Sequence, residues 1–229
     1  MYLYPLLFLI ERDDFLLYPV QYVFVTGIDI GLRYPITIFN SYHRFYNITE
    51  PYEIITYLNY LQCLIRDSKS ISEKNRLKKE YKVRKRAIVD ILAQYILKTL
   101  PPYTVLGIEK MNLNQGWPTL IQFGRLIDIL QDGCSKKGIQ LVRVDATNTS
   151  NMCPRCGHVD KDCRDKKRHV YLCNNCGLIC NDDAIAAWNI HNRTYETVFG
   201  RKFDNTLEGY IPVVVRGNKN IPFLNIIPD

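Results

Sequence analysis

The stretch Cys173-Asn-Asn-Cys176-Gly-Leu-Ile-Cys-Asn-Asp-Asp183-Ala-Ile-Ala-Ala187-Trp-Asn189-Ile190 joins a CxxC pair to an alanine-rich segment, with an aspartate between them. The apolar residues after Asp183 recur at helical spacing, so we expect a helix there, with Asn181 or Asp182 as its N-terminal cap. Asp183 would then lie in the first turn. The stretch therefore predicts a cysteine knuckle that leads directly into a helix bearing a candidate catalytic carboxylate.

A second pair, Cys153-x2-Cys156, lies upstream and is separated from Cys173-x2-Cys176 by sixteen residues. This spacing is typical of two knuckles that supply four thiolates to one tetrahedral zinc ion. Gly157 and Gly177 each follow a pair, where a knuckle turn often needs a positive φ. Two disulfides are the alternative, but the chain shows no secretory signal and a reducing cytosol favours thiolate-metal bonds. The other cysteines, interpreted as buried or incidental thiols, are Cys63, Cys134, Cys163 and Cys180.

The composition is that of a globular domain with a small insert: 229 residues, 47% hydrophobic and 23% charged. The apolar opening, residues 1–10, lacks a basic region and stops at Glu11-Arg-Asp-Asp14, so it is too short to span a bilayer. We interpret it as a strand. We expect no membrane partner, no secretion, and a cytoplasmic protein that is nucleoid-associated in a prokaryote or virus.

The positive charge is concentrated in residues 66–86, which hold ten Lys and Arg against three acids. Leu77, Tyr81 and Ile88 recur at roughly helical spacing, so the basic side chains would cover the outer surface of a helix. These side chains are Lys74, Arg76, Lys78, Lys79, Lys82, Arg84, Lys85 and Arg86. A second basic patch between the cysteine pairs comprises Lys161, Arg164, Lys166, Lys167, Arg168 and His169. A solvated basic face is the alternative, but this density of like charge favours a polyphosphate partner.

Hydrophobic runs predict buried strands at residues 22–31, 36–39, 104–109 and 139–144. The first two look like a hairpin. Amphipathic spacing predicts helices at 88–100, which ends at Pro101-Pro102, and at 120–130. The element order is strands, helix, strand, helix, strand, insert, helix.

Carboxylates interrupt this pattern at Asp29 in the first strand, at Glu109 at the end of a later strand, and at Asp183. This order is that of an RNase H-like α/β fold, a mixed sheet flanked by helices, here with an inserted zinc ribbon. Hard oxygen ligands suit Mg²⁺ or Mn²⁺, and two such ions can hydrolyse a phosphodiester. For each acid, a cap, a surface acid or an ion pair is the alternative, and Asp182 is the neighbour most easily confused with Asp183.

These motifs resemble the transposon-encoded TnpB (OrfB) family, relatives of the type V CRISPR effectors with a split RuvC-like domain. The matching pieces are Gly27-Ile-Asp29-Ile-Gly31, Gly107-Ile-Glu109, Thr149-Ser150-Asn-Met-Cys153-Pro-Arg-Cys156-Gly157, Cys173-Asn-Asn-Cys176-Gly177 and Asp183-Ala-Ile-Ala186-Ala187-Trp-Asn189-Ile190. By this resemblance Asp29, Glu109 and Asp183 take the three catalytic positions, with Asp183 preferred to Asp182 because the family's acid lies three residues before the Ala-Ala pair. The family's proteins are RNA-guided DNA endonucleases, so the resemblance implies DNA and a guide RNA as partners.

The resemblance also predicts how the chain is divided. We expect vestigial N-terminal strands at 1–22, the first part of a RuvC-like nuclease domain at 23–150, an inserted zinc ribbon at 151–180, the last nuclease helix at 181–198, and a tail of unassigned role at 199–229. Family members carry a large N-terminal half that grips guide RNA, whereas some twenty residues precede the first acid-bearing strand here. We therefore expect most of that half to be missing, which leaves guide binding open.

The principal hypothesis is a Mg²⁺- or Mn²⁺-dependent DNA endonuclease that uses the three acids and holds phosphates with the basic helix. The alternative is a nucleic-acid-binding regulator or accessory factor that keeps the fold and the zinc but does not cut. Three clustered carboxylates repel one another unless metal offsets them, which favours the nuclease. A third hypothesis is a structure-specific resolvase that acts as a dimer.

Overall fold

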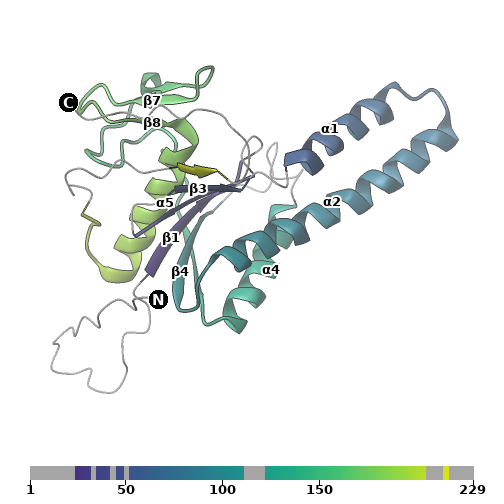
Figure 1. Ribbon diagram of the computed structural model, residues 1–229. Coiled ribbons are helices and arrows are strands. Elements are labelled where there is room, and N and C mark those ends of the chain that lie inside the picture. The colour runs from purple at the N-terminus through teal and green to yellow at the C-terminus, as the bar shows by residue number, and fades with distance from the viewer. Residues whose placement is uncertain are drawn as a thin grey trace.

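The centre of the structure is a six-stranded mixed sheet with the strand order β5-β4-β1-β2-β3-β9 (Figure 1). The computed structural model describes residues 24–31, 35–41, 45–48, 52–110, 122–204 and 214–216. The strands are β1 (Phe24–Asp29), β2 (Ile36–Asn40), β3 (Phe45–Ile48), β4 (Thr104–Glu109), β5 (Gln140–Val144) and β9 (Val214–Arg216). β1 pairs antiparallel with β2 and parallel with β4, and β4 pairs parallel with β5.

The predicted strands and the hairpin of β1 and β2 are thus confirmed, as is the RNase H-like α/β fold. β3 and β9 extend the sheet beyond the strands that hydrophobic runs predicted. The strand predicted at residues 1–10, and the vestigial strands at 1–22, lie outside the described residues.

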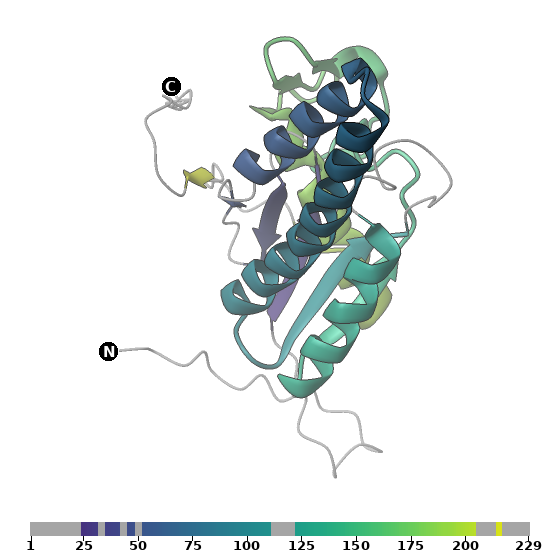
Figure 2. The ribbon, with the colours of Figure 1, turned by 90° about the vertical axis from the view of Figure 1, so that its right-hand side faces the viewer.

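Helices cover both faces of the sheet (Figures 1 and 2). α2 (Ile71–Thr99) and α4 (Phe123–Lys136) pack on the face formed by Ile28 and Ile108, and α5 (Asp182–Phe199) packs on the other face. The Ser70 side chain caps α2, accepting a hydrogen bond from the Glu73 amide, and the helix stops before Pro101 as predicted. No helix among these described residues is both long and apolar enough to cross a membrane.

The helix α1 (Tyr52–Asp67) was not predicted. It runs against the N-terminal half of α2 and buries Ile55, Leu58 and Leu61, which are spaced three residues apart. That spacing carries a helical signal, but the isoleucine, threonine and tyrosine residues around it favour strands and obscure it.

A small antiparallel sheet forms the ribbon that carries the two cysteine pairs and precedes α5. Its strands are β6 (Arg164–Asp165), β7 (Val170–Leu172) and β8 (Ile179–Asn181), preceded by the short 3-10 helix η1 (Lys161–Cys163). β8 ends at Asn181 and α5 begins at Asp182, so the ribbon passes into the helix without a linker.

α5 lies unusually close to the sheet because two glycines face it. A Cβ atom added at Gly27 of β1 would collide with the backbone of Ala187 and His191, and one added at Gly107 of β4 would collide with the Thr194 side chain. The two glycines are directly paired in the parallel register of β1 and β4. Because these two glycines have no side chains, the backbone of α5 can lie directly against β1 and β4.

We predict that Gly27→Ala destabilises the protein by about 1–3 kcal/mol or more, because backbone atoms of α5 would have to move away from β1. Gly133→Ala in α4 is the matched control, since the Cβ there would meet only the flexible end of the Leu97 side chain. Urea denaturation of both variants measures the difference. An equal loss of unfolding free energy in the two variants would contradict this account of how α5 packs on the two glycines.

Candidate active site and nucleic-acid surface

Asp29 and Glu109 are the last residues of two adjacent parallel strands. The register pairs Ile28 with Ile108, so the two acids follow at neighbouring carboxyl ends of the sheet. Alternation along a strand places them on the same side as Gly27 and Gly107, toward α5. Both residues border one small hollow, together with Phe123 and the isoleucines Ile28, Ile30 and Ile108.

Asp183 reaches the same end of the sheet through α5. This helix starts at the ribbon and runs back along β1 (Figure 1), and Ala187 lies against Gly27. Two residues along β1 from Gly27 to Asp29 cover about 7 Å, and four residues back along α5 from Ala187 to Asp183 cover about 6 Å. Asp29 and Asp183 therefore lie at similar heights on facing elements.

The pKa of Asp29 reflects this proximity. Burial, followed by the negative charges of Glu109 and Asp183, raises the pKa of Asp29 to about 8, although the Arg164 guanidinium acts in the opposite direction. Burial also raises the pKa of Glu109. Without a cation, the site holds its carboxylates under mutual repulsion, which is the situation that a divalent metal relieves.

The three acids are nevertheless not the tightest ligand group. Among the residues that the structure describes, three groups have ligand atoms that all lie within 4.8 Å of one another. They are the four ribbon cysteines, the set of His158, Asp160 and Cys163, and the set of His169, Asp182 and Asp183. Asp183 belongs to the last of these, with Asp182, whereas Asp29 and Glu109 belong to none. The assignment of Asp29, Glu109 and Asp183 to one metal site stays a prediction.

Glu109 is positioned by residues that sequence reasoning did not single out. Thr149 donates its hydroxyl to the Glu109 carboxylate. The turn that carries Thr149 is held by α5, because the Asn189 side-chain amide donates to the carbonyls of Thr149 and Met152, at 2.7 Å each. The charge of Arg193, also on α5, lowers the pKa of Glu109 against the effect of burial. Thr149 and Asn189 lie within the motifs quoted above, but only the folded chain gives them this role.

Asp182 and Asp183 have different environments. The Asp182 side chain is only 2% exposed and pairs with Arg164 at 3.0 Å and with His169 at 3.4 Å. The Asp183 side chain is 19% exposed, and Arg164 lies 3.7 Å from it. Asn181, rather than Asp182, caps the helix by accepting the Asp183 amide hydrogen. Asp182 is therefore a buried ion-pair residue, and Asp183 is the more accessible acid.

The environment of Arg164 corrects one sequence interpretation. The sequence places Arg164 in the second basic patch, but the fold turns its side chain toward Asp182 and Asp183, and this side chain is only 20% exposed. Its positive charge therefore pairs with the two aspartates at the start of α5. Sequence spacing could not show this, because Arg164 and Asp183 meet only when the ribbon folds back on the helix.

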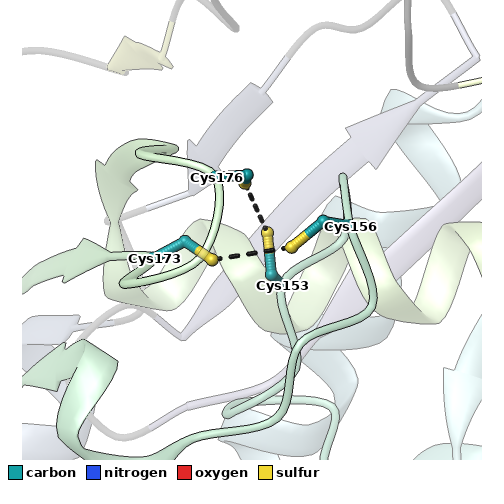
Figure 3. A group of neighbouring side chains, drawn as sticks. All are labelled: Cys153, Cys156, Cys173 and Cys176. Carbon is teal, nitrogen blue, oxygen red and sulfur yellow. Dashed lines mark hydrogen bonds between the residues drawn. The ribbon is translucent and has the colours of Figure 1, made fainter.

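The four predicted zinc ligands gather at one point of the ribbon (Figure 3). The Sγ atoms of Cys153 and Cys176 are 3.5 Å apart, and those of Cys156 and Cys173 are 3.6 Å apart. Tetrahedral zinc with bonds of about 2.3 Å separates its sulfur ligands by about 3.8 Å, whereas a disulfide needs about 2.05 Å. The geometry fits one zinc-type ion.

The knuckles themselves also have the predicted form. Gly157 and Gly177 have φ values of 75° and 69°, as their positions after each cysteine pair predicted. The two turns repeat the same hydrogen bonds, since each glycine amide donates to the carbonyl of the first cysteine of its pair, Cys153 or Cys173. The backbone alone thus preforms two equivalent halves of the cluster.

The predicted basic helix is the N-terminal half of α2, which projects from the sheet together with α1 (Figures 1 and 2). Between Leu77 and Ile88 no residue of α2 is buried. Of its eight predicted side chains, Arg76 pairs with Glu80 at 3.9 Å, and Arg84 lies 5.5 Å from the centre of the Tyr57 ring. The exposed members with neither an ion pair nor a ring contact among the described residues are Lys78, Lys79, Lys82 and Arg86.

The ribbon carries a smaller basic turn at Lys166, Lys167 and Arg168, all exposed. Asp165 shapes this turn by accepting the amide hydrogens of Lys167 and Arg168 at 2.9 and 3.0 Å. Arg168 also lies 3.7 Å from the Asp165 carboxylate. Lys166 and Lys167 are therefore the members of this patch that extend from the turn without an ion pair in the described part of the chain.

Together these features define a class: a RuvC-type, RNase H-like domain interrupted by a four-cysteine ribbon just before its last helix. Residues 123–190 match the family described as "Cas12f1-like, TNB domain". This match agrees with the predicted resemblance to the type V CRISPR effectors. No curated protein gives a significant match.

Two solved structures share the fold. A Cas12f1-sgRNA-target DNA complex superimposes with a TM-score of 0.57 at 16% identity, covering 80% of this chain and 51% of that one. A CRISPR-Cas12f ternary complex gives a TM-score of 0.53 at 16% identity, covering 75% of this chain and 39% of that one. The chain therefore spans about half, or less, of the length of these relatives.

The raised pKa of Asp29 predicts a pH-dependent stability when no magnesium or manganese is present. The unfolded carboxyl loses its proton near its ordinary value of 3.8, while the folded one keeps it up to about 8. Unfolding free energy therefore falls as the pH rises between these values. Asp29→Asn should remove that fall and raise the melting temperature at pH 8 to 9, by about 2–4 °C for each kcal/mol of relieved repulsion.

Thermal scans at pH 4 to 9, in buffer without added divalent cations, measure this effect. Asp128→Asn on the exposed side of α4 is the matched control. A parallel pH dependence of wild type and Asp29→Asn would contradict the electrostatic description of the site.

Proposed function

We propose that this chain is the nuclease part of a TnpB-like, RNA-guided DNA endonuclease that hydrolyses phosphodiesters with divalent cations. The observation that carries the proposal is the convergence of Asp29, Glu109 and Asp183 at one end of the sheet, where two of these charges act on the third. The family match over residues 123–190 supports it, because that segment includes both the ribbon and the start of α5.

The residues fit a site for Mg²⁺ or Mn²⁺. Their donors are carboxylate oxygens, which hard cations prefer, and the repulsion that burial imposes on Asp29 is what a bound cation would offset. Two such ions would activate a water molecule and stabilise the leaving 3′ oxygen. A deprotonated Asp29 is required, so binding should strengthen as the pH rises toward 8.

The chain's own residues orient this site. Thr149 fixes the Glu109 carboxylate through its hydroxyl, and the turn that bears it is fastened to α5 by Asn189. Arg164 neutralises Asp182 and part of the Asp183 charge, so the helix can begin with two adjacent acids. We propose zinc in the four-cysteine cluster as the ion that holds the ribbon, and with it Arg164, in place.

DNA as substrate and RNA as guide are proposed from the similar Cas12f1 structure, which contains an sgRNA and target DNA. The projecting half of α2 offers exposed cations for phosphates. Sequencing the nucleic acid that copurifies with the protein tests the guide: a discrete small RNA supports it, and heterogeneous or absent RNA favours unguided action.

The three acids yield the first prediction for function. Asp29→Ala should lower Mg²⁺-dependent cleavage of single-stranded DNA by at least about two orders of magnitude, because metal stabilisation of the reacting charge is worth several kcal/mol. DNA affinity should change by less than about threefold, since the backbone contacts lie elsewhere. Labelled-strand cleavage and fluorescence anisotropy measure the two quantities.

Asp128→Ala is the control and should cut normally, because this acid lies on the exposed side of α4. Unchanged cutting by Asp29→Ala would reject the catalytic assignment. Binding without cutting by the wild-type protein, with its RNA present, would instead support the non-cleaving regulator.

The basic surface yields a second prediction. Replacing Lys78, Lys79, Lys82 and Arg86 by Gln should weaken binding to single-stranded nucleic acid and reduce the slope of log affinity against log salt by up to about 3, at about 0.7 for each lost contact. Anisotropy titrations at several salt concentrations measure the slope. The control double variant Arg125→Gln/Lys136→Gln removes exposed charge from α4. Equal slopes in the two variants would contradict a specific role for α2.

A further inference from the structure

A second group of metal-ligand side chains lies on the ribbon, apart from both the four cysteines and the acids. His158, Asp160 and Cys163 fall within six consecutive residues after the first knuckle, and their ligand atoms all lie within 4.8 Å of one another. The Asp160 side chain accepts the Asp162 amide hydrogen, and so caps the short helix η1, which turns Cys163 back toward it. The local backbone thus brings the three donors together.

The three donors match a borderline-soft divalent cation. Imidazole, carboxylate and thiolate are all zinc ligands, with bonds of about 2.0–2.3 Å and donor atoms about 3.3–3.8 Å apart around a tetrahedral ion. Nε2 of His158 and Oδ2 of Asp160 are already 3.9 Å apart. These two side chains are 38% and 31% exposed and have room to adjust, while Cys163 is fixed in the ribbon core at 2% exposure.

Asn174 ties this group to the second knuckle. Its backbone amide donates to Sγ of Cys163 at 3.4 Å, and its side-chain amide donates to Oδ2 of Asp160 at 3.1 Å. Hydrogen bonds of this kind stabilise a thiolate and orient a carboxylate, as the outer partners of metal ligands usually do. One residue of the Cys173 knuckle therefore supports two of the three donors.

We propose that His158, Asp160 and Cys163 form a second zinc-class site on the ribbon, with its fourth position open to solvent. The site is separate from the proposed nuclease chemistry and does not depend on it. Its ion would fasten the segment 158–163 to the second knuckle, next to the four-cysteine cluster. The competing account is that Asp160 serves only as a cap and as a partner of Asn174.

The experiment is zinc stoichiometry of the full chain, measured by plasma mass spectrometry after equilibration with zinc and washing in excess Mg²⁺. Wild type should hold two zinc ions. His158→Ala should hold one, because this change removes a ligand whose only described side-chain contact is Asp160. Cys163→Ser should also hold one, and Cys63→Ser, an exposed cysteine on α1, should hold two.

Cobalt substitution separates the sites by their spectra. The four-thiolate site should give the strong charge-transfer absorption of a sulfur cage, and His158→Ala should remove only a weaker contribution from one thiolate. Because Cys163 is buried, its replacement also disturbs the packing of the ribbon core, and His158→Ala is therefore the decisive variant. The variant Asp29→Asn shows whether any zinc is bound by the carboxylates of Asp29, Glu109 and Asp183.

One zinc in wild type, or two zinc ions in His158→Ala, would overturn the proposal. A second zinc lost in Asp29→Asn but kept in His158→Ala would likewise overturn it, since that ion would belong to the acids. Failure of the nuclease assays alone would leave the predicted stoichiometry unchanged, so the two proposals fail separately.

Discussion

The close packing of α5 on two glycines is the constraint on which the rest of the structure depends. Gly27 and Gly107 are paired across β1 and β4, and the absence of a Cβ at each lets the helix backbone approach the sheet. That approach puts Asp183 at the height of Asp29. A helix held farther from the sheet by ordinary side chains would keep its sequence motif and lose the convergence of the acids. The glycines thus matter for the site although neither bears a functional group.

The convergence has an electrostatic cost that the same helix helps to offset. Burial and the charges of Glu109 and Asp183 raise the pKa of Asp29, which is unfavourable near neutral pH. The compensating groups reach the acids through α5 or through segments fastened to it: Arg193 from the helix, Thr149 through Asn189, and Arg164 through its pairing with Asp182. This end of the sheet therefore holds a buried carboxyl whose ionisation lowers stability, a feature that is common at functional sites.

The sequence predicted those parts of the fold that are encoded locally. Apolar runs located β1, β4 and β5, helical spacing located α2 and α5, and the cysteine spacing located the ribbon, including the positive φ of Gly157 and Gly177. What depends on tertiary contact was missed or wrong. The sequence places Arg164 in a basic patch with its neighbours, and only the fold turns its side chain toward Asp182. β3 and β9 pair in a register that their short sequences do not specify.

The order of elements suggests why the ribbon is inserted where it is. β8 ends at Asn181, and the Asn181 side chain caps α5 by accepting the amide hydrogen of Asp183 itself. β6 supplies Arg164 to the next acid, and the turn before β7 supplies His169. These contacts to the first turn of α5 come from a segment whose buried cysteines Cys153, Cys163 and Cys173 pack in one apolar cluster with α5 itself. The four clustered cysteines lie in this same segment, so an ion bound there would help to hold the shape of the ribbon. Because β8 ends at Asn181 and α5 begins at Asp182, any change in the shape of the ribbon would pass directly into the first turn of α5.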